Sequence, residues 1–231
     1  MWLFPLDAQK WARSGRGRTR LARRCAGLVA TTIAECAALL AFPLVPRAAA
    51  ACPDVQVVFA RGTGEPPGLG RVGNAMVASL RQKTDQSIGA YAVNYPANKD
   101  FLAAADGAND ASDHVQQMTN ECPNTKLVLG GYSQGAAVID IVTAAPLPGL
   151  GFTQPLPAQA AQHVAAVTLF GNPSGRAGGL MTALSPHFGG KILNLCNTGD
   201  PICSDGDQWK AHTGYVPGLT NKAASFVAGR I

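Results

Sequence analysis

The sequence predicts an α/β domain with a parallel sheet that is covered by helices on both faces. Short aliphatic segments alternate with helical segments from residue 51 to the end of the chain. Parallel strands that are buried on both faces read as continuous aliphatic runs, and helices supply the crossovers between them. No repeat or low-complexity linker interrupts 51–231, so one domain of about 180 residues is expected.

Five segments have the length and aliphatic content of strands: 54–60, 90–95, 126–131, 163–171 and 191–196. Four segments read as helices: 73–82, 110–121, 134 to about 144, and 221–231. Thr220 immediately precedes the last helix and is expected to be its N-cap. The proline-rich segment 145–159 is expected to be a loop or a rim of a binding site.

Residues 1–50 have the three-part order of an export signal peptide. An arginine-rich stretch ends at RLARRC, the mostly apolar AGLVATTIAECAALLAFPLV follows, and RAAAAC supplies small residues. A membrane anchor is the alternative, but Glu35 and Pro43 argue against it, since a carboxylate is costly in lipid. We therefore expect cleavage after Ala48, Ala50 or a close neighbour, and secretion of a single domain that comprises 51–231.

The net charge of +5 belongs to this leader. Residues 1–50 contain eight of the 19 basic residues and two of the 14 acidic ones, so 51–231 has a net charge of −1. A nucleic-acid partner is not expected, because phosphate binding requires a clustered positive surface.

Four cysteines lie beyond the leader. An even number in an exported chain predicts two disulfides, for which three pairings are possible. Cys196 and Cys203 are close enough to clip one loop, which leaves Cys52 to pair with Cys122. No CxxC pair or adjacent histidine gives zinc-ligand spacing, so no metal site is expected.

The segment LVLGGYSQGAAV at 127–138 places Ser133 between a predicted strand and a predicted helix. Gly131 and Gly135 flank the serine in the pattern of a nucleophile elbow, which projects the serine oxygen above the carboxyl edge of a sheet. Side chains at the two glycines would collide with the strand and the helix that meet there. An ordinary turn is the alternative, but strand, turn and helix all agree with an elbow.

A serine hydroxyl needs a histidine base to become a nucleophile, and in elbow enzymes that histidine follows the serine and the acid. Three histidines follow Ser133. His163 opens an apolar strand, and His187 comes just before a strand, toward the amino edge of the sheet. His212 follows the last predicted strand at the carboxyl edge, so it is the expected base.

The acid that orients this base is expected to be Asp200. It directly follows the strand 191–196 and lies inside the loop clipped by the two late cysteines. Asp205 and Asp207 are rivals, but they lie outside or beyond the clip. A disulfide around the acid's loop would reduce its freedom and help to preorganise a triad of Ser133, Asp200 and His212.

The oxyanion of an acyl-transfer reaction needs two donors. The Gln134 N–H lies at a helix start beside Ser133, and FARGTGEPPGLG after the first strand offers the N–H and hydroxyl of Thr63. The same stretch partly resembles a dinucleotide-binding loop, but Pro67 occupies the third glycine position. No nucleotide site is therefore expected.

Five regions across nearly all of 51–231 carry a resemblance to a known family: VFARGTGE, YAVNYPA, CPNTKLVLGGYSQGAAVID, LFGNP and LCNTGDPICSDG with AHTGYV. They resemble cutinase-family serine esterases, most closely the exported cutinase-like proteins of mycobacteria and their relatives. The resemblance implies an α/β-hydrolase, a three-layer α/β/α sandwich with a central parallel sheet of about five strands and no large lid. It implies the same triad, disulfides and Gln134 donor; fungal members have serine at the position of Thr63.

The family implies a secreted serine esterase that forms an acyl-enzyme without a metal or cofactor. The expected substrates are carboxylic esters with short- to medium-chain acyl groups, lipids or polyesters. Segments 95–106 and 204–212 match family segments that border the acyl groove. Phe101, Leu102 and Trp209 are groove candidates there, although isolated apolar residues equally serve in packing. A monomer that meets a lipid interface or the cell envelope is expected.

Two other functions stay open at the level of sequence. A polysaccharide acetyl esterase of the same fold would use the same triad and a smaller acyl pocket. A secreted surface or binding protein with little activity would not need an intact triad. A serine peptidase is less favoured, because nothing indicates a pocket for a peptide side chain.

Overall fold

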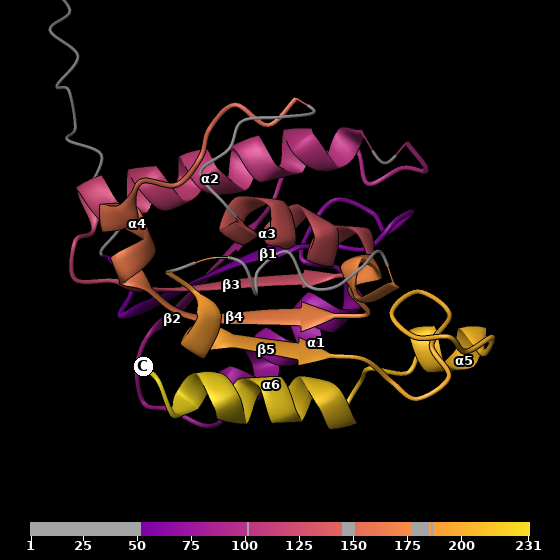
Figure 1. Cartoon of the computed structure of the whole chain (residues 1–231). Helices are drawn as coiled ribbons and strands as arrows, with labels where there is room; N and C mark the ends of the chain where they lie inside the picture. The colour runs from indigo at the N-terminus through magenta and orange to yellow at the C-terminus, as the bar shows by residue number, and fades with distance from the viewer. Residues whose placement is uncertain (1–51, 101, 145–150, 177–184, 186) are drawn as a thin grey trace, which may run out of the picture. The chain divides into compact units, whose positions relative to one another are not determined.

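The computed structural model describes residues 52–100, 102–144, 151–176, 185 and 187–231 (Figure 1). The expected export signal, its cleavage site and Phe101 lie outside the described residues. So does 145–150, the first part of the proline-rich segment.

Five parallel strands form the central sheet, as predicted. Their order across the sheet is β2-β1-β3-β4-β5. The strands are β1 (Val55–Ala60), β2 (Ile88–Ala92), β3 (Lys126–Tyr132), β4 (Val164–Phe170) and β5 (Ile192–Leu195). The chain moves outward in opposite directions from β1 and from β3, so the loops that leave these two neighbours diverge. In such sheets the binding crevice opens at the carboxyl ends of the strands at this switch point.

Helices cover both faces of the sheet (Figure 1). On one face lie α2 (Ala103–Glu121), α3 (Gln134–Ala144) and the short α4 (Ala158–His163); on the other lie α1 (Gly70–Arg81) and α6 (Gly218–Ala228). A further turn of helix, α5 (Trp209–His212), stands beyond the carboxyl end of β5. The three-layer α/β/α fold is the one predicted.

Alternate residues of the strands build two separate hydrophobic cores. Val58 and Leu129 pack with the residues under α2 and α3, whereas Phe59 and Val128 pack with the residues under α1 and α6. This period of two follows from the pleat of a strand. All four side chains are fully buried, and each contributes about 1.5–3 kcal/mol by leaving water.

Helix α2 begins at Ala103, seven residues before the predicted start. The Asp100 carboxylate accepts the Leu102 N–H at 3.0 Å, and the alanines that follow favour a helix. Gly107 is accommodated because α2 packs closely on its neighbours: a Cβ there would lie 3.0–3.2 Å from Tyr95 and Val138. The last four residues of the segment 95–106, which was expected to border the acyl groove, therefore lie in α2.

The remaining boundary errors are small. Strand β2 starts two residues earlier and ends three residues earlier than predicted, and His163 ends α4 instead of opening β4. Thr220 is not an N-cap: α6 begins at Gly218, and the Thr220 hydroxyl donates to the Pro217 carbonyl at 2.9 Å. A threonine whose hydroxyl bonds to the carbonyl of residue i−3 lies inside the first turn of a helix. Thr220 therefore marks the start of α6, as predicted, but from within the first turn and not from the N-cap position.

Two disulfides have the predicted pairing. Cys52 is bonded to Cys122, which ties the entry of β1 to the end of α2, and Cys196 is bonded to Cys203 beyond β5. Within the residues that the structure describes, no helix is both long and apolar enough to cross a membrane.

Candidate active site

Ser133 occupies a strained turn between β3 and α3. Its φ is +56°, in the left-handed region that non-glycine residues rarely adopt, and its N–H donates to the Phe170 carbonyl of β4 at 2.8 Å. The surrounding backbone must hold such a conformation, because it costs on the order of 1–3 kcal/mol. The strain places the Ser133 hydroxyl at the carboxyl edge of the sheet.

The flanking glycines allow this turn because the backbone approaches them too closely for a side chain. A Cβ at Gly131 would lie 2.1 Å from the Gly135 carbonyl oxygen, and a Cβ at Gly135 would lie 2.0 Å from the Ala60 carbonyl oxygen. Both obstacles are backbone atoms of packed elements and cannot move aside. The steric reason predicted for the two glycines is therefore confirmed.

Three side chains from separate segments form one chain of hydrogen bonds. His212 Nε2 lies 3.0 Å from Ser133 Oγ, and His212 Nδ1 lies 3.0 and 2.9 Å from the two carboxylate oxygens of Asp200. His212 is 6% exposed and Asp200 is fully buried. The structure thus brings together the three residues that the sequence singled out.

Asp200 is held by its own clipped loop. Its Oδ1 accepts the Ile202 N–H at 2.7 Å, and its backbone carbonyl accepts the N–H and the hydroxyl of Ser204. Burial alone raises the pKa of this carboxyl group, but the hydrogen bonds from Tyr215, Ile202 and His212 outweigh it and lower the pKa below its usual value. The side chain is therefore an ionised acceptor at neutral pH.

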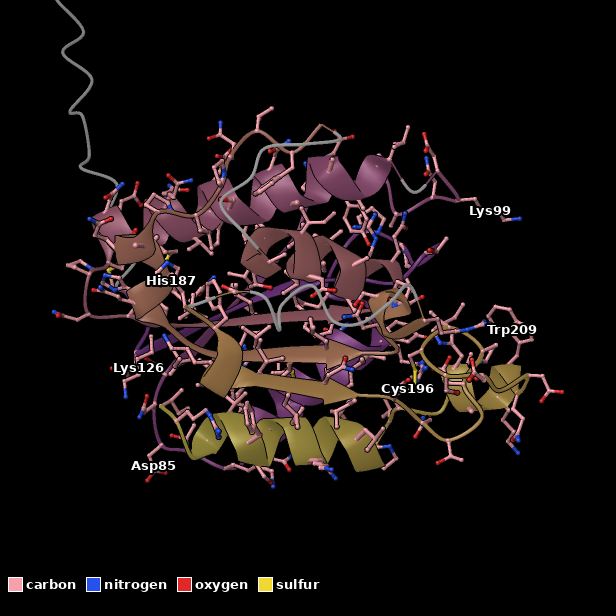
Figure 2. All side chains as sticks on the ribbon, in the orientation of Figure 1. Asp85, Lys99, Lys126, His187, Cys196 and Trp209 are labelled. Carbon is pink, nitrogen blue, oxygen red and sulfur yellow. A yellow bond between two sulfur atoms is a disulfide. The ribbon has the colours of Figure 1, made fainter. Side chains whose placement is uncertain are left out.

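The rival residues lie elsewhere. Figure 2 shows His187 on the side of the sheet opposite to Cys196 and Trp209, as expected for the amino edge. His163 ends α4 before β4 begins. Asp205 is fully exposed, 3.9 Å from the Arg176 guanidinium, and Asp207 is exposed as well.

The two predicted oxyanion donors stand on the loop after β1 and at the start of α3. The Thr63 hydroxyl donates to Gln134 Oε1 at 3.0 Å, which joins the two residues across the crevice. Among the described residues, neither the Thr63 N–H nor the Gln134 N–H donates to another group. Neither N–H is therefore occupied by an acceptor within the described part of the chain.

The Thr63 loop is fastened from behind. The Glu65 carboxylate accepts the Gly62 N–H at 2.7 Å and the Arg71 N–H at 2.8 Å. Buried Arg61 donates to the Glu65 carbonyl at 2.8 Å and to the carbonyls of Val93 and Tyr95, which follow β2. This loop therefore presents Thr63 from a rigid base.

A groove of about 650 Å³ opens in front of Ser133 and is lined mainly by apolar surface. Trp209 lies on its rim, 64% exposed, with its ring edge-on to His212 at 5.8 Å between centroids. Leu102 does not line this groove; it is 67% exposed and borders a second hollow with Asp100 and Ala103, because it stands at the start of α2. Phe101 lies outside the described residues.

Comparison with known protein families shows which family this fold and site belong to. Residues 51–231 match the family model described as Cutinase. The chain belongs to the cutinase family. This match covers every residue of the hydrogen-bonded chain and both disulfides.

Curated cutinase-family relatives extend the match over most of the chain. "Phospholipase Culp4" of Mycobacterium tuberculosis is 72% identical over 218 residues, which are 94% of this chain and 96% of that one. "Carboxylesterase Culp1" of Mycobacterium tuberculosis is 46% identical over 215 residues, which are 88% of this chain and 94% of that one. The cutinase family membership and these relatives make the chain a carboxylic ester hydrolase.

Solved structures of the cutinase fold agree. The catalytic core domain of acetyl xylan esterase from Trichoderma reesei superposes with a TM-score of 0.69 at 27% identity, covering 78% of this chain and 100% of that one. Trichoderma reesei cutinase, in complex with a phosphonate inhibitor, superposes with a TM-score of 0.62 at 33% identity, covering 77% of this chain and 76% of that one. Both support the α/β-hydrolase assignment.

Sequence reasoning missed two tyrosines that pack around His212 in this cutinase-family site. Tyr132 precedes the serine; its hydroxyl donates to the His212 carbonyl at 2.8 Å and its ring stacks on the imidazole at 5.1 Å. Tyr215 follows three residues after His212, and its hydroxyl donates to Asp200. Their proximity in sequence to predicted site residues was the available signal.

Proposed function

We propose that the chain is a secreted serine esterase that cleaves carboxylic esters through an acyl-enzyme. The main support is a continuous series of hydrogen bonds from Ser133 Oγ through His212 to Asp200. Ser133 itself is held in a strained turn. Nucleophile, base and orienting acid then stand within hydrogen-bond reach of one another.

In the first half of the reaction, Ser133 Oγ attacks the ester carbonyl and His212 Nε2 takes its proton. Asp200 holds the Nδ1–H of His212 and stabilises the imidazolium that forms. His212 then protonates the leaving alcohol as the carbon–oxygen bond breaks. In the second half, a water molecule attacks the acyl-enzyme with His212 as base, and Ser133 recovers its proton as the acid leaves.

The tetrahedral oxyanion is stabilised by the Gln134 N–H and by Thr63. The Gln134 N–H lies at the N-terminus of α3, whose dipole favours negative charge. The Gln134 side chain holds the Thr63 hydroxyl before substrate arrives. The methyl group of threonine restricts the rotation by which this hydroxyl turns toward the oxyanion.

The decisive test is Ser133→Ala, assayed with a nitrophenyl ester and a fluorescent phosphonate. Only an oxygen is lost, so thermal unfolding should stay near that of the parent while hydrolysis falls by several orders of magnitude. Ser204→Ala is the control, because its hydroxyl serves only the clipped loop and phosphonate labelling should persist. Labelling of another serine in Ser133→Ala would refute the assignment.

The acyl part of the substrate is proposed to be short to medium in length, from a lipid or polyester. The apolar groove and the exposed Trp209 on its rim support this choice. The likeness to acetyl xylan esterase keeps a polysaccharide acetyl ester as the alternative. Rates on esters with two to sixteen acyl carbons separate the two: a maximum at two carbons favours the acetyl ester.

Phospholipid is a second candidate substrate. The relative of 72% identity is named a phospholipase, and Arg176 lines the groove in front of Ser133. Its guanidinium donates to the Pro201 carbonyl at 2.7 Å, which keeps the positive charge at the rim, where it would meet a lipid phosphate. Arg176→Gln should slow hydrolysis of an anionic phospholipid about tenfold more than hydrolysis of a neutral diacylglycerol with the same chains.

Arg176→Lys is the matched variant, because it retains the charge and loses the forked geometry. It should recover most of the discrimination in favour of the phospholipid. Equal losses on both lipids in Arg176→Gln would instead assign Arg176 to loop support.

Secretion is proposed from the leader and is supported by the two disulfides, which are typical of exported chains. The mature protein would act as a monomer at a lipid interface or on the cell envelope. Fractionation of the native host, with N-terminal sequencing of the extracellular form, tests both the location and the cleavage near Ala48 to Ala50.

A further inference from the structure

Tyr215 makes a hydrogen bond that the mechanism above does not use. Its hydroxyl donates to Asp200 Oδ2 at 2.6 Å, the same oxygen that lies 2.9 Å from His212 Nδ1. Tyr215 is fully buried. The Asp200 carboxylate thus receives three donors from three separate places: the Ile202 N–H, the His212 ring and the Tyr215 hydroxyl.

The tyrosine is fixed in the donating orientation. The Asn197 N–H donates to the Tyr215 oxygen at 3.3 Å, so the phenol proton is left for Asp200. The ring packs edge-on against Phe170 at 5.9 Å and Tyr132 at 5.7 Å between centroids. Burial and the neighbouring carboxylate raise the pKa of Tyr215 far above its usual value, so the hydroxyl remains a donor at any working pH.

The third donor, the Tyr215 hydroxyl, satisfies a hydrogen-bonding requirement of the buried Asp200 carboxylate. A carboxylate with no direct access to water must have its lone pairs satisfied by protein donors. Ile202 fixes only one of the two oxygens, and the carboxyl group can rotate about its last bond unless the other is also held. Tyr215 supplies that second anchor from outside the disulfide-clipped loop.

We propose that Tyr215 is a positioning residue for catalysis: its hydroxyl fixes the ionised Asp200 carboxylate in the orientation that receives the His212 N–H. The inference rests on the proposed function of the Ser133, His212 and Asp200 chain. The Tyr215 hydroxyl also lies 3.5 Å from Cys203 Sγ, and its ring is edge-on to His212 at 6.4 Å between centroids, but its hydroxyl reaches the reaction through the bond to the acid.

The other buried tyrosine of the site has a different role. Tyr132 donates to the backbone carbonyl of His212 and makes no hydrogen bond to the carboxylate. The titratable groups that face Asp200 are His212, Tyr215 and, at longer range, Tyr132, which lies beside Arg71 and Glu65. Of these three side chains, Tyr215 is the one that bonds the carboxylate through a hydroxyl group; the Ile202 N–H is a backbone donor.

The test is Tyr215→Phe, which keeps the ring packing and removes one hydroxyl. We expect kcat to fall about ten- to a hundredfold with KM unchanged, the scale of a hydrogen bond to a charged group. Without this donor the pKa of Asp200 rises. Because Asp200 and His212 titrate as a coupled pair, the pair then takes up its proton at a higher pH. The acid limb of kcat/KM should therefore move to higher pH.

Tyr91→Phe is the matched control. Tyr91 also donates to a carboxylate, with both oxygens of Asp110 at 3.0 Å, but it stands on β2 at the far edge of the sheet. It should leave kcat and the acid limb unchanged. A Tyr215→Phe enzyme with the parent's kcat and acid limb, or with an acid limb at lower pH, would overturn the proposal.

A second readout does not depend on turnover. The proton between His212 Nδ1 and Asp200 should give a low-field NMR resonance in the Ser133→Ala protein, and the added Tyr215→Phe change should shift or broaden it. An unmoved resonance also overturns the positioning role. If the fluorescent phosphonate does not label Ser133 in the parent enzyme, the proposed function is refuted instead. The two failures are therefore distinguishable.

Discussion

The serine and its two partners are held in place by different physical means. Ser133 is locked by backbone packing: the elbow glycines touch carbonyl oxygens of neighbouring elements at distances that exclude any side chain. Asp200 stands on the loop after β5 and His212 on the short helix α5; both segments are tied by the Cys196–Cys203 bond and by side-chain hydrogen bonds. The first region is part of the core, and the second is attached to it.

This difference predicts different consequences of damage. A change at the elbow disturbs the contact between β1, β3 and α3 and therefore the whole fold. A change in the segment between Cys196 and Tyr215 should disturb the geometry of the proposed acid and base while the sheet and its two cores remain intact. Stability and turnover should therefore respond separately in the two regions.

The largest expected effect is that of Gly135→Ala. A Cβ at 2.0 Å from the Ala60 carbonyl forces β1 and α3 apart, and we expect a loss of about 3 kcal/mol or more in the free energy of unfolding. Urea unfolding followed by circular dichroism measures this loss. Gly218→Ala is the control: a Cβ there meets nothing within 4 Å, so stability should stay within about 1 kcal/mol of the parent.

The two disulfides give the next test, because Cys52–Cys122 ties the entry of β1 to the end of α2, away from Ser133, and Cys196–Cys203 lies in the attached region. Removal of Cys52–Cys122, which spans 70 residues, should cost roughly 4 kcal/mol in the chain-entropy model and leave kcat unchanged in the folded fraction. Removal of Cys196–Cys203, which spans seven, should cost roughly 2–3 kcal/mol and lower kcat as well. Serine double mutants measured for both melting temperature and kcat at 20 °C or so provide the comparison.

The Cys196→Ser/Cys203→Ser protein distinguishes two roles of this disulfide: positioning of Asp200 for catalysis, and stabilisation of the fold alone. His212 would lose a fixed partner for its Nδ1–H and spend less time in the productive tautomer, so kcat should fall even where the protein is folded. Full turnover in a folded Cys196→Ser/Cys203→Ser protein would end the preorganisation argument and leave Asp200 as a candidate for the acid. A loss of kcat in the Cys52–Cys122 mutant would end the contrast between the two bonds.

The same division explains what the sequence could reveal. The elbow was predictable because its physics is local: a strand, a small-residue corner and a helix occupy one continuous stretch around Ser133. The two cores were predictable because aliphatic runs specify parallel strands. The prediction of Asp200 and His212 used their order along the chain and their position after the last strand. These two features place the residues at the carboxyl edge of the sheet, but they do not give the contacts between them.

The missed features depend on contacts between distant segments. Both tyrosines lie near site residues in the sequence, but that proximity does not reveal their partners: the Tyr215 bond to Asp200 and the Tyr132 bond to the His212 carbonyl form only when β5 and its loops are folded back. The early start of α2 was missed because the packing of Gly107 against Val138 is also a tertiary contact. Leu102 was assigned to the groove from a family position and faces another hollow once α2 is formed.

The acid dependence of stability should be traceable to the attached region. The folded state lowers the pKa of Asp200 below its usual value of 3.8, so it favours the ionised form. The resulting stabilisation is complete above the unfolded-state pKa and is lost as pH falls through the lower folded-state value. The difference in unfolding free energy between the parent and Asp200→Asn should therefore shrink below about pH 4; a difference that stays constant from pH 7 to pH 2.5 would contradict the assignment.

The smallest expected effect is that of Trp209→Ala, which tests whether the attached region also contacts substrate. The indole is mostly exposed, so its removal should change the free energy of unfolding by less than about 0.5 kcal/mol. If the ring covers the acyl chain, kcat/KM should fall about three- to tenfold on an eight-carbon ester and hardly at all on an acetyl ester, because only the longer chain buries area against it. Leu102→Ala is the matched control, as it is equally exposed but borders another hollow. Equal losses on both esters would assign Trp209 to support of the His212 ring, against which its edge packs.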